Sequence, residues 1–124
     1  MEWFERLSGN ETARQIIGAA GESQALGYLQ DQGLTLVTQN FRCKVGEIDL
    51  IMRHGETLVF IEVRARASSQ YGGAAASVTP AKQRRLIRAA QFYLQRFRAV
   101  PPCRFDVVAI DAGVMQWLKN AIEA

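Results

Sequence analysis

Residues 46–66 read GEIDLIMRHGETLVFIEVRAR, and this stretch decides the fold of the chain. Two runs rich in β-branched and aliphatic residues, 47–53 and 57–64, flank a break at Gly55, which is the pattern of a β-hairpin. A two-residue type II′ turn prefers glycine at its first central position, so Gly55 begins the turn and fixes the register. The predicted pairs are His54 with Thr57, Met52 with Val59, Ile51 with Phe60, Leu50 with Ile61 and Ile48 with Val63.

The same count places two acidic residues, Asp49 and Glu62, directly opposite each other. Like charges at facing positions of a sheet repel, and buried carboxylates are costly unless they are paired or bound to a metal. Facing residues have Cβ atoms roughly 4.5–5.5 Å apart, which allows two carboxylates to share one divalent ion. Side chains alternate along a strand, so Glu47 and Arg64 lie on the same face as this pair. The sequence therefore predicts a polar cluster with a cation at one end of an otherwise apolar hairpin.

Length and composition are those of one globular domain. The chain has 124 residues, of which 48% are hydrophobic and 22% charged, so it can bury a core of its own. We predict a single domain over residues 1–124, with residues 1–11 loosely attached. No run approaches the ~18 apolar residues of a membrane span, and the acidic opening is unlike a signal peptide, which favours a cytoplasmic protein without membrane contact. Cys43 and Cys103 lack companions at zinc spacing and are predicted to be reduced thiols.

Charge is distributed unevenly along the chain. Residues 1–41 carry a net charge of −3, residues 42–104 carry 12 basic and 4 acidic side chains, and residues 105–124 carry a net charge of −2. The basic excess of +8 therefore surrounds Asp49 and Glu62. Two interpretations stay open: an ordinary solvated basic surface, and the footprint of a polyanion around an acidic metal site.

The rest of the chain completes an α/β fold. A capping box at Thr12 begins a helix that ends before Gly33, and Thr79-Pro80 supplies the N-cap and first position of a second helix. A strand, a helix and a strand then follow in a βαβ crossover, which makes the last strand parallel to the one that carries Glu62. The predicted elements are a helix at 12–32, strands at 34–38, 47–53 and 57–64, a helix at 79–97 and strands at 103–110 and 114–118, with loops at 40–46 and 67–77. They form a central mixed five-stranded sheet flanked by helices, in the order α-β-β-β-α-β-β.

Basic residues gather where the chain approaches the acidic pair. Arg42 and Lys44 lie in the loop before the hairpin, and four cations crowd the first two turns of the second helix, where the macrodipole disfavours positive charge. An anionic partner would offset that cost, and a solvated basic helix face is the alternative. The loop after residue 66 is rich in glycine and alanine, which predicts a flexible flap. The candidate nucleic-acid contacts are Arg42, Lys44, Arg66, Tyr71, Lys82, Arg84, Arg85 and Arg88.

The acidic pair and its neighbouring cation suit metal-assisted phosphodiester hydrolysis. Asp49 is followed, after a 12-residue interval, by Glu62-Val63-Arg64. The carboxylates would hold Mg²⁺ or Mn²⁺, which lowers the pKa of a bound water and neutralises the phosphate, while the cation steadies a reacting oxygen. The only histidine, His54, belongs to the predicted turn, so a nucleophilic triad is disfavoured.

These motifs resemble those of a known group of proteins. The acidic hairpin, preceded by a glutamate-bearing helix and followed by a βαβ crossover, resembles the PD-(D/E)XK nuclease superfamily, which has the restriction-endonuclease-like fold. The chain more closely resembles the YraN-like family of small uncharacterised proteins, which is itself similar to archaeal Holliday junction resolvases. The resemblance rests on Gly21-Glu22, Ala25, Tyr28-Leu29, Asn40, GEIDLI at 46–51, FIEVR at 60–64 and RFDVV at 104–108.

By this resemblance the chain is a single nuclease-like domain, and Glu22, Asp49 and Glu62 match the metal-binding acids of the resolvases. Glu22 borders the apolar stripe of its helix, and only the resemblance gives it a role. Arg64 stands where the nucleases have lysine, and an arginine guanidinium orients phosphate but does not act as a base. The resemblance thus implies Glu22, Asp49, Glu62 and Arg64 as catalytic residues. If the chemistry needs a lysine, Lys82 or Lys44 must reach in.

Three functions are compatible with these observations. The first is an Mg²⁺- or Mn²⁺-dependent endonuclease that acts on DNA, including junctions and other structured forms, and the resolvase resemblance implies a homodimer. The second is a nucleic-acid-binding protein of nuclease fold that no longer cuts, because Arg64 replaces the usual lysine. The third is a scaffold protein whose acids are structural.

Overall fold

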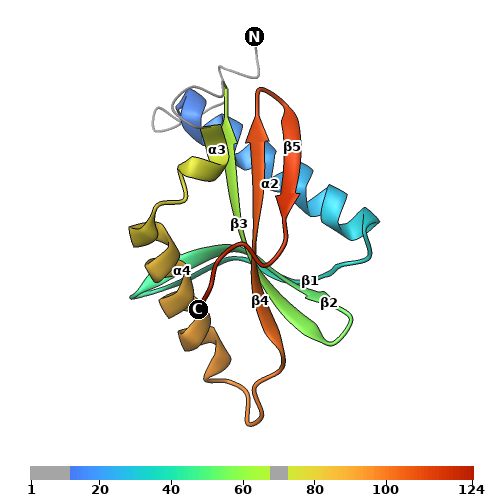
Figure 1. Cartoon of the computed structure of the whole chain (residues 1–124), viewed down its shortest axis with the longest axis vertical. Coiled ribbons are helices and arrows are strands. Elements are labelled where there is room, and N and C mark those ends of the chain that lie inside the picture. The colour runs from blue at the N-terminus through green and yellow to red at the C-terminus, as the bar shows by residue number, and fades with distance from the viewer. Residues whose placement is uncertain (1–11, 68–72) are drawn as a thin grey trace.

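The chain folds into a mixed β-sheet with a long helix on each face (Figure 1). The computed structural model describes residues 12–67 and 73–124. Its elements in chain order are α2 (Ala13–Asp31), β1 (Thr35–Cys43), β2 (Gly46–His54), β3 (Thr57–Arg66), α3 (Gly73–Ala76), α4 (Pro80–Leu94), β4 (Cys103–Asp111) and β5 (Val114–Leu118). The strands lie in sequence order, and all neighbours are antiparallel except β3 and β4, which are parallel. The predicted α/β architecture, its order of long elements and the parallel crossover are confirmed.

The central hairpin has the predicted register over most of its length. Strands β2 and β3 pair from His54–Thr57 to Leu50–Ile61 as counted from the sequence. Gly55 has a φ of 63°, the sign that the first central position of a type II′ turn requires. The register is set locally because the turn type and the apolar pattern of both strands agree.

The first strand is longer than predicted. β1 continues into the predicted loop at 40–46 as far as Cys43, and it pairs Phe41 with Ile48 and Arg42 with Glu47. An irregularity between Leu36 and Thr38 and a left-handed φ of 55° at Asn40 interrupt the alternation, so the sequence pattern stops too early.

Both long helices begin as predicted. Thr12 and Gln15 form the reciprocal hydrogen bonds of a capping box at α2, and Thr79 accepts a hydrogen bond from the Lys82 N–H at α4. α4 ends at Leu94 rather than at residue 97, and the chain continues in turns with Phe97 still packed on the core. No helix in residues 12–67 and 73–124 is long and apolar enough to cross a membrane.

The two faces of the sheet carry separate cores. Alternation along β3 sends Phe60 toward α4 and Val59 and Ile61 toward α2. Leu86, Ala90 and Tyr93 of α4 pack on the Phe60 side, while Ala25 and Leu29 of α2 pack on the other side. This sandwich holds β3, which carries Glu62 and Arg64, between two helices.

A short helix that we did not predict from the sequence, α3, lies between β3 and α4 in the chain. Residues 67–77 were predicted as a loop, but Gly73–Ala76 form the helical turn α3, with Gly73 and Ala74 buried. The Ala74 N–H donates to Asp111 Oδ1 at 2.7 Å, which fixes the turn to the end of β4. A glycine is required at the start because Gly73 has a φ of 77° and an added Cβ would lie 2.9 Å from Asp111 Oδ1.

Candidate active site

The predicted acidic pair lies where β2 and β3 stop pairing. The ladder ends at Leu50–Ile61, and the backbone pairs expected for Asp49–Glu62 and Ile48–Val63 do not form. Ile48 packs with the α4 core while Val63 packs with the α2 core, so the two strands separate at this point. Asp49 Oδ2 instead accepts a hydrogen bond from the Val63 N–H at 2.8 Å. The two acids therefore meet through their side chains at the point of separation.

The carboxyl groups of Asp49 and Glu62 are neighbours in a mostly buried site. Burial raises the pKa of Glu62 to about 8. The charge of Asp49 and the hydrogen bond that protonated Glu62 donates to the Asp49 carboxylate act in the same direction. Burial also raises the pKa of Asp49, although the Val63 N–H and the hydrogen bond with Glu62 oppose this. Two carboxyl groups this close share a proton unless a cation replaces it. Such a pair is more typical of a functional site than of a structural contact.

A third buried acid shows what a structural carboxylate looks like in this fold. Asp106 is fully buried, and Arg104 Nε donates to its two carboxylate oxygens at 3.0 and 3.2 Å. The Trp117 indole N–H and the Asn120 backbone N–H donate to the same group at 2.9 Å each. Asp106 thus has a complete set of partners. Among the described residues, Asp49 and Glu62 have each other, the Val63 N–H at Asp49 and one loose contact of Glu62 with Arg64.

Glu22 approaches the pair from α2. Gly21 brings the helix close to β3, because a Cβ at this position would lie 2.9 Å from Ala65 Cβ. Burial raises the pKa of Glu22 to about 7, and the charges of Asp49 and Glu47 add to the rise. The side chain lines a hollow between α2 and β1, together with Gln39, Asn40 and Arg42 among others. Glu22 is thus electrostatically linked to Asp49 but borders a different hollow from Glu62.

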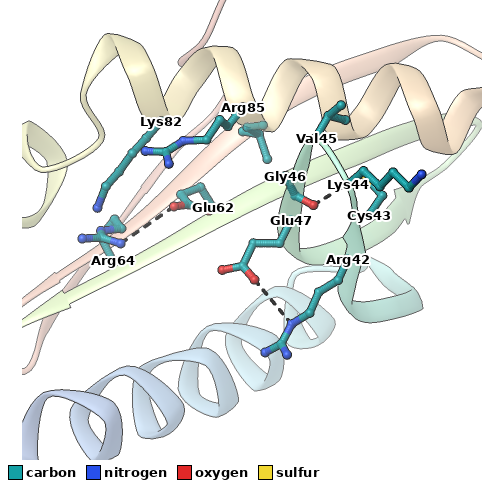
Figure 2. A pocket seen from close by; sticks show the side chains of 11 residues that line it. Arg42, Cys43, Lys44, Val45, Gly46, Glu47, Glu62, Arg64, Lys82 and Arg85 are labelled. Carbon is teal, nitrogen blue, oxygen red and sulfur yellow. Dashed lines mark hydrogen bonds and ion pairs between the residues drawn. The ribbon is translucent and has the colours of Figure 1, made fainter.

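A cavity of about 500 Å³ opens beside Glu62, between the β1–β2 turn and α4 (Figure 2). Figure 2 shows that Glu62 and Arg64 come from β3, while Lys82 and Arg85 come from α4. Its lining residues are Arg42, Cys43, Lys44, Val45, Gly46, Glu47, Glu62, Arg64, Lys82, Arg85 and Leu86. Five cationic side chains against two acidic ones make this a positively charged hollow beside the acidic pair.

Arg64 is held in place by the short helix α3. Its Nε donates to Ser77 Oγ at 3.0 Å, and the Ser77 hydroxyl donates to the Ala74 carbonyl at 2.6 Å. Arg64 NH1 lies 3.9 Å from Glu62 Oε2, at the outer limit of an ion pair. The guanidinium is therefore positioned mainly by Ser77, and its remaining N–H donors are available to a ligand.

Lys82 enters the same cavity from the first turn of α4. Burial lowers the pKa of Lys82, the Arg64 guanidinium lowers it further, and the charge of Glu62 opposes both effects. Figure 2 shows the ends of Lys82 and Arg64 side by side. A lysine therefore lies at the site even though β3 supplies an arginine.

The acids suit a divalent ion as a pair rather than as a triad. Across residues 12–67 and 73–124, no three His, Cys, Asp or Glu side chains are grouped closely enough to hold one ion together. Asp49 and Glu62 are hard oxygen ligands in contact with each other. Mg²⁺ is commonly bound by one or two carboxylates with water completing its shell, so this pair fits such an ion. The three-acid set with Glu22 stays a prediction.

The structure divides the predicted nucleic-acid contacts into two groups. Arg42, Lys44, Lys82 and Arg85 line the cavity. Arg66, Arg84 and Arg88 are not among its lining residues, and Arg84 and Arg88 are exposed on α4. Tyr71 lies outside the described residues.

Sequence reasoning missed two residues that shape the site. Ser77 orients Arg64 across an interval of 13 residues, and no local pattern marks this contact. Gly46 lets the β1–β2 turn touch α4, because a Cβ there would lie 2.6 Å from the Arg85 carbonyl oxygen. A glycine at the start of a strand hints at close backbone approach, but the partner is not visible in the sequence.

Comparison with known proteins places the chain in a family. Residues 21–110 match the uncharacterised protein family UPF0102. The chain is 66% identical over 118 residues to a UPF0102 protein of Herminiimonas arsenicoxydans, with 95% of each chain covered. It is 65% identical over 113 residues to a UPF0102 protein of Janthinobacterium sp. (strain Marseille), covering 91% of this chain and 92% of the relative. A UPF0102 protein of Cupriavidus taiwanensis is 54% identical over 118 residues, covering 94% of this chain and 90% of the relative. The chain therefore belongs to the uncharacterised protein family UPF0102, the YraN-like family.

Proposed function

We propose that this protein is a divalent-metal-dependent endonuclease that hydrolyses phosphodiester bonds in DNA, with branched or otherwise structured DNA as its substrate class. One observation carries the proposal: Asp49 and Glu62 are two mostly buried carboxyl groups in contact, beside a cavity lined by five cationic side chains. Buried acids in contact favour a cation, and a basic hollow favours a polyanion. The resemblance to PD-(D/E)XK nucleases supports the same assignment and suggests junctions as substrates.

Each residue has a role that its position permits. Asp49 and Glu62 would hold Mg²⁺ or Mn²⁺, which when bound lowers the pKa of a coordinated water and neutralises phosphate charge. The Val63 N–H fixes the Asp49 carboxylate, so that its free oxygen is oriented before the ion arrives. Arg64, held by Ser77, would orient a phosphate with its remaining donors. Glu22 would add negative charge on the α2 side.

The test is DNA cleavage by the purified protein with Mg²⁺ or Mn²⁺. Junction, flap and linear duplex substrates are compared, and we expect cleavage that falls by about two to three orders of magnitude in Asp49→Asn and in Glu62→Gln. Glu56→Gln is the matched control, because it is the same substitution at an exposed position in the turn, at the other end of the hairpin. Cleavage that persists in both site variants at the wild-type rate would show that another protein in the sample is responsible.

Arg64 favours a second candidate function, that of a DNA-binding protein without nuclease activity. Arg64 occupies the position of the nuclease lysine, and an arginine side chain does not act as a base, which suits a DNA-binding protein that no longer cuts. In that case DNA binds in a salt-dependent manner, and no metal yields a product. Arg64→Lys discriminates between the two functions. A gain of cleavage in this variant alone would identify an inactive site, whereas an active wild type would exclude the second candidate.

A further inference from the structure

Two cationic side chains from different elements converge beside Glu62. Arg64 comes from β3 and Lys82 comes from α4, and both line the same cavity (Figure 2). Arg64 is the largest charge influence on the pKa of Lys82, which also indicates that the two groups are close. Like charges in a partly buried site repel, so their proximity calls for an anion between or beside them.

The described residues around this site supply that anion only in part. Arg64 NH1 is 3.9 Å from Glu62 Oε2, which is a loose contact. In the parts of the chain that the structure describes, no carboxylate lies within 4.0 Å of the Lys82 ammonium. The hydrogen bond from Arg64 to Ser77 and the further bond from Ser77 to Ala74 nevertheless keep the guanidinium in place. Within residues 12–67 and 73–124, two adjacent cations are thus held without a close carboxylate partner.

We propose that Arg64 and Lys82 together bind one phosphodiester group of a nucleic acid strand, and that Lys82 supplies the lysine that the arginine of β3 displaces from the site. Arg64 is the fixed cation of the two. Its guanidinium can donate two N–H groups to two oxygens of the phosphate. Lys82 acts as a point charge on a longer flexible stem that follows the same phosphate. This inference rests on the proposed function, since it places the phosphate beside the acids that would hold the ion.

The first experiment measures DNA binding without metal, so that it does not depend on cleavage. Fluorescence anisotropy with a short labelled duplex in EDTA gives Kd for wild type, Lys82→Gln, Arg64→Gln and the double variant. We expect Lys82→Gln to weaken binding about tenfold, as loss of a hydrogen bond to a charged group does. The control is Arg53→Gln, which removes the same charge from an exposed position near the hairpin turn and should change Kd by no more than about threefold.

The double variant separates a shared phosphate from two independent contacts. If both cations hold one phosphate, removing the second cation weakens DNA binding by a smaller factor than removing the first. The fold-changes in Kd of the single variants then do not multiply in the double variant. Fold-changes in Kd that multiply, or a Lys82→Gln variant that binds DNA as tightly as Arg53→Gln does, would overturn the proposal. Lys82→Met, of similar length and apolar, repeats the test if the glutamine variant has a lowered Tm.

Competition identifies the source of the phosphate. The dinucleotide thymidylyl-thymidine should displace labelled DNA from wild type at lower concentration than inorganic phosphate does at equal ionic strength, and this preference should vanish in Lys82→Gln. Preference for inorganic phosphate would exclude a nucleic acid strand as the ligand.

Cleavage then tests the role of Lys82 at saturating DNA. We expect Lys82→Gln to reduce the cleavage rate at least tenfold, and Arg64→Lys to restore part of that loss in the same chain. If wild type never cleaves but the binding results hold, the proposed nuclease function fails and the phosphate site stands. If cleavage requires Asp49 and Glu62 while Lys82→Gln cuts and binds like wild type, only the phosphate site fails.

Discussion

The pKa of the Glu62 carboxyl group is set by the residues that surround it. In a free peptide its carboxyl group is ionised at neutral pH, but burial and the neighbouring Asp49 raise its pKa to about 8. The residue would therefore carry a proton at neutral pH until a cation displaces it. This coupling makes the metal-free protein sensitive to pH.

Replacing Glu62 with glutamine should stabilise the metal-free protein at alkaline pH. A raised pKa contributes stability that is complete below the ordinary value near 4.5 and is lost as the pH rises through about 8. Urea unfolding in EDTA from pH 5 to 9 should show wild type losing stability across this range, with Glu62→Gln more stable at pH 9 on the order of 2 kcal/mol. The slope should flatten but not vanish, because burial also raises the pKa of Asp49 and Glu22.

Glu56→Gln is the control, since Glu56 is exposed in the hairpin turn. Identical pH profiles for wild type and Glu62→Gln would contradict a buried, protonated Glu62. Added Mn²⁺ should raise the Tm of wild type at pH 8 and leave that of Glu62→Gln nearly unchanged, because a bound ion stabilises the folded state.

At the scale of elements, the site depends on how closely helices approach the sheet. Glu22 lies close enough to feel the charge of Asp49, and Gly21 contributes to this by allowing α2 to contact Ala65 of β3. The cavity has its shape because Gly46 allows the β1–β2 turn to contact the backbone of α4 at Arg85. Both glycines act by lacking a side chain, which allows the neighbouring element to approach the backbone closely.

Two alanine substitutions in α2 should therefore have opposite effects. Gly21→Ala places a Cβ 2.9 Å from Ala65 Cβ, and we expect a loss of about 1–3 kcal/mol in the free energy of unfolding. Gly27→Ala in the same helix meets no atom within 4 Å and should gain about 0.5–1 kcal/mol from helix propensity. Chemical denaturation of the two variants measures both changes. If Gly21→Ala raised the free energy of unfolding as much as Gly27→Ala, the space between α2 and Ala65 would be large enough for a Cβ at position 21.

At the scale of the whole molecule, charge is sorted by position. The net charge is only +3, yet five cationic side chains line one cavity while the basic residues Arg84 and Arg88 point elsewhere. Binding of a polyanion would therefore be governed by this cavity rather than by total charge.

Salt dependence should report which cations contact phosphate. For a cation that neutralises one phosphate, substitution reduces the slope of log Kobs against log salt by about 0.7–0.9. We expect this change for Arg85→Gln, which alters the cavity lining, and little change for Arg53→Gln, which removes an exposed cation near the hairpin turn. Titrations with labelled DNA between low and physiological salt measure the slopes. Equal slopes for the two variants would indicate diffuse binding over the surface.

The sequence by itself determined the two strands of the central hairpin and their register from the turn to the Leu50–Ile61 pair. Gly55 sets the turn, alternation sets the two faces of β3, and Thr12 and Thr79 start the helices at the expected places. The parallel placement of β4 followed from the helix between the strands. The turn, the faces and the helix starts were predictable because each depends on hydrogen bonds or periodicity within a few residues. The placement of β4 was predictable because a helical crossover joins parallel strands.

Only the tertiary structure decided how the side chains meet. The strands separate at Asp49 because Ile48 and Val63 belong to opposite cores, so the acids pair through their side chains. Arg85 lines the cavity while its neighbour Arg84 does not, a distinction that the helical pattern did not resolve.

The contact of Arg64 with Ser77 depends on the helical turn α3 and its hydrogen bond to Asp111, which no pattern in residues 67–77 indicates. The local sequence determines which groups are present on an element and roughly which way they face. Their distances and pKa values depend on residues far apart in the chain, because burial and the approach of other charges arise only when the elements pack together.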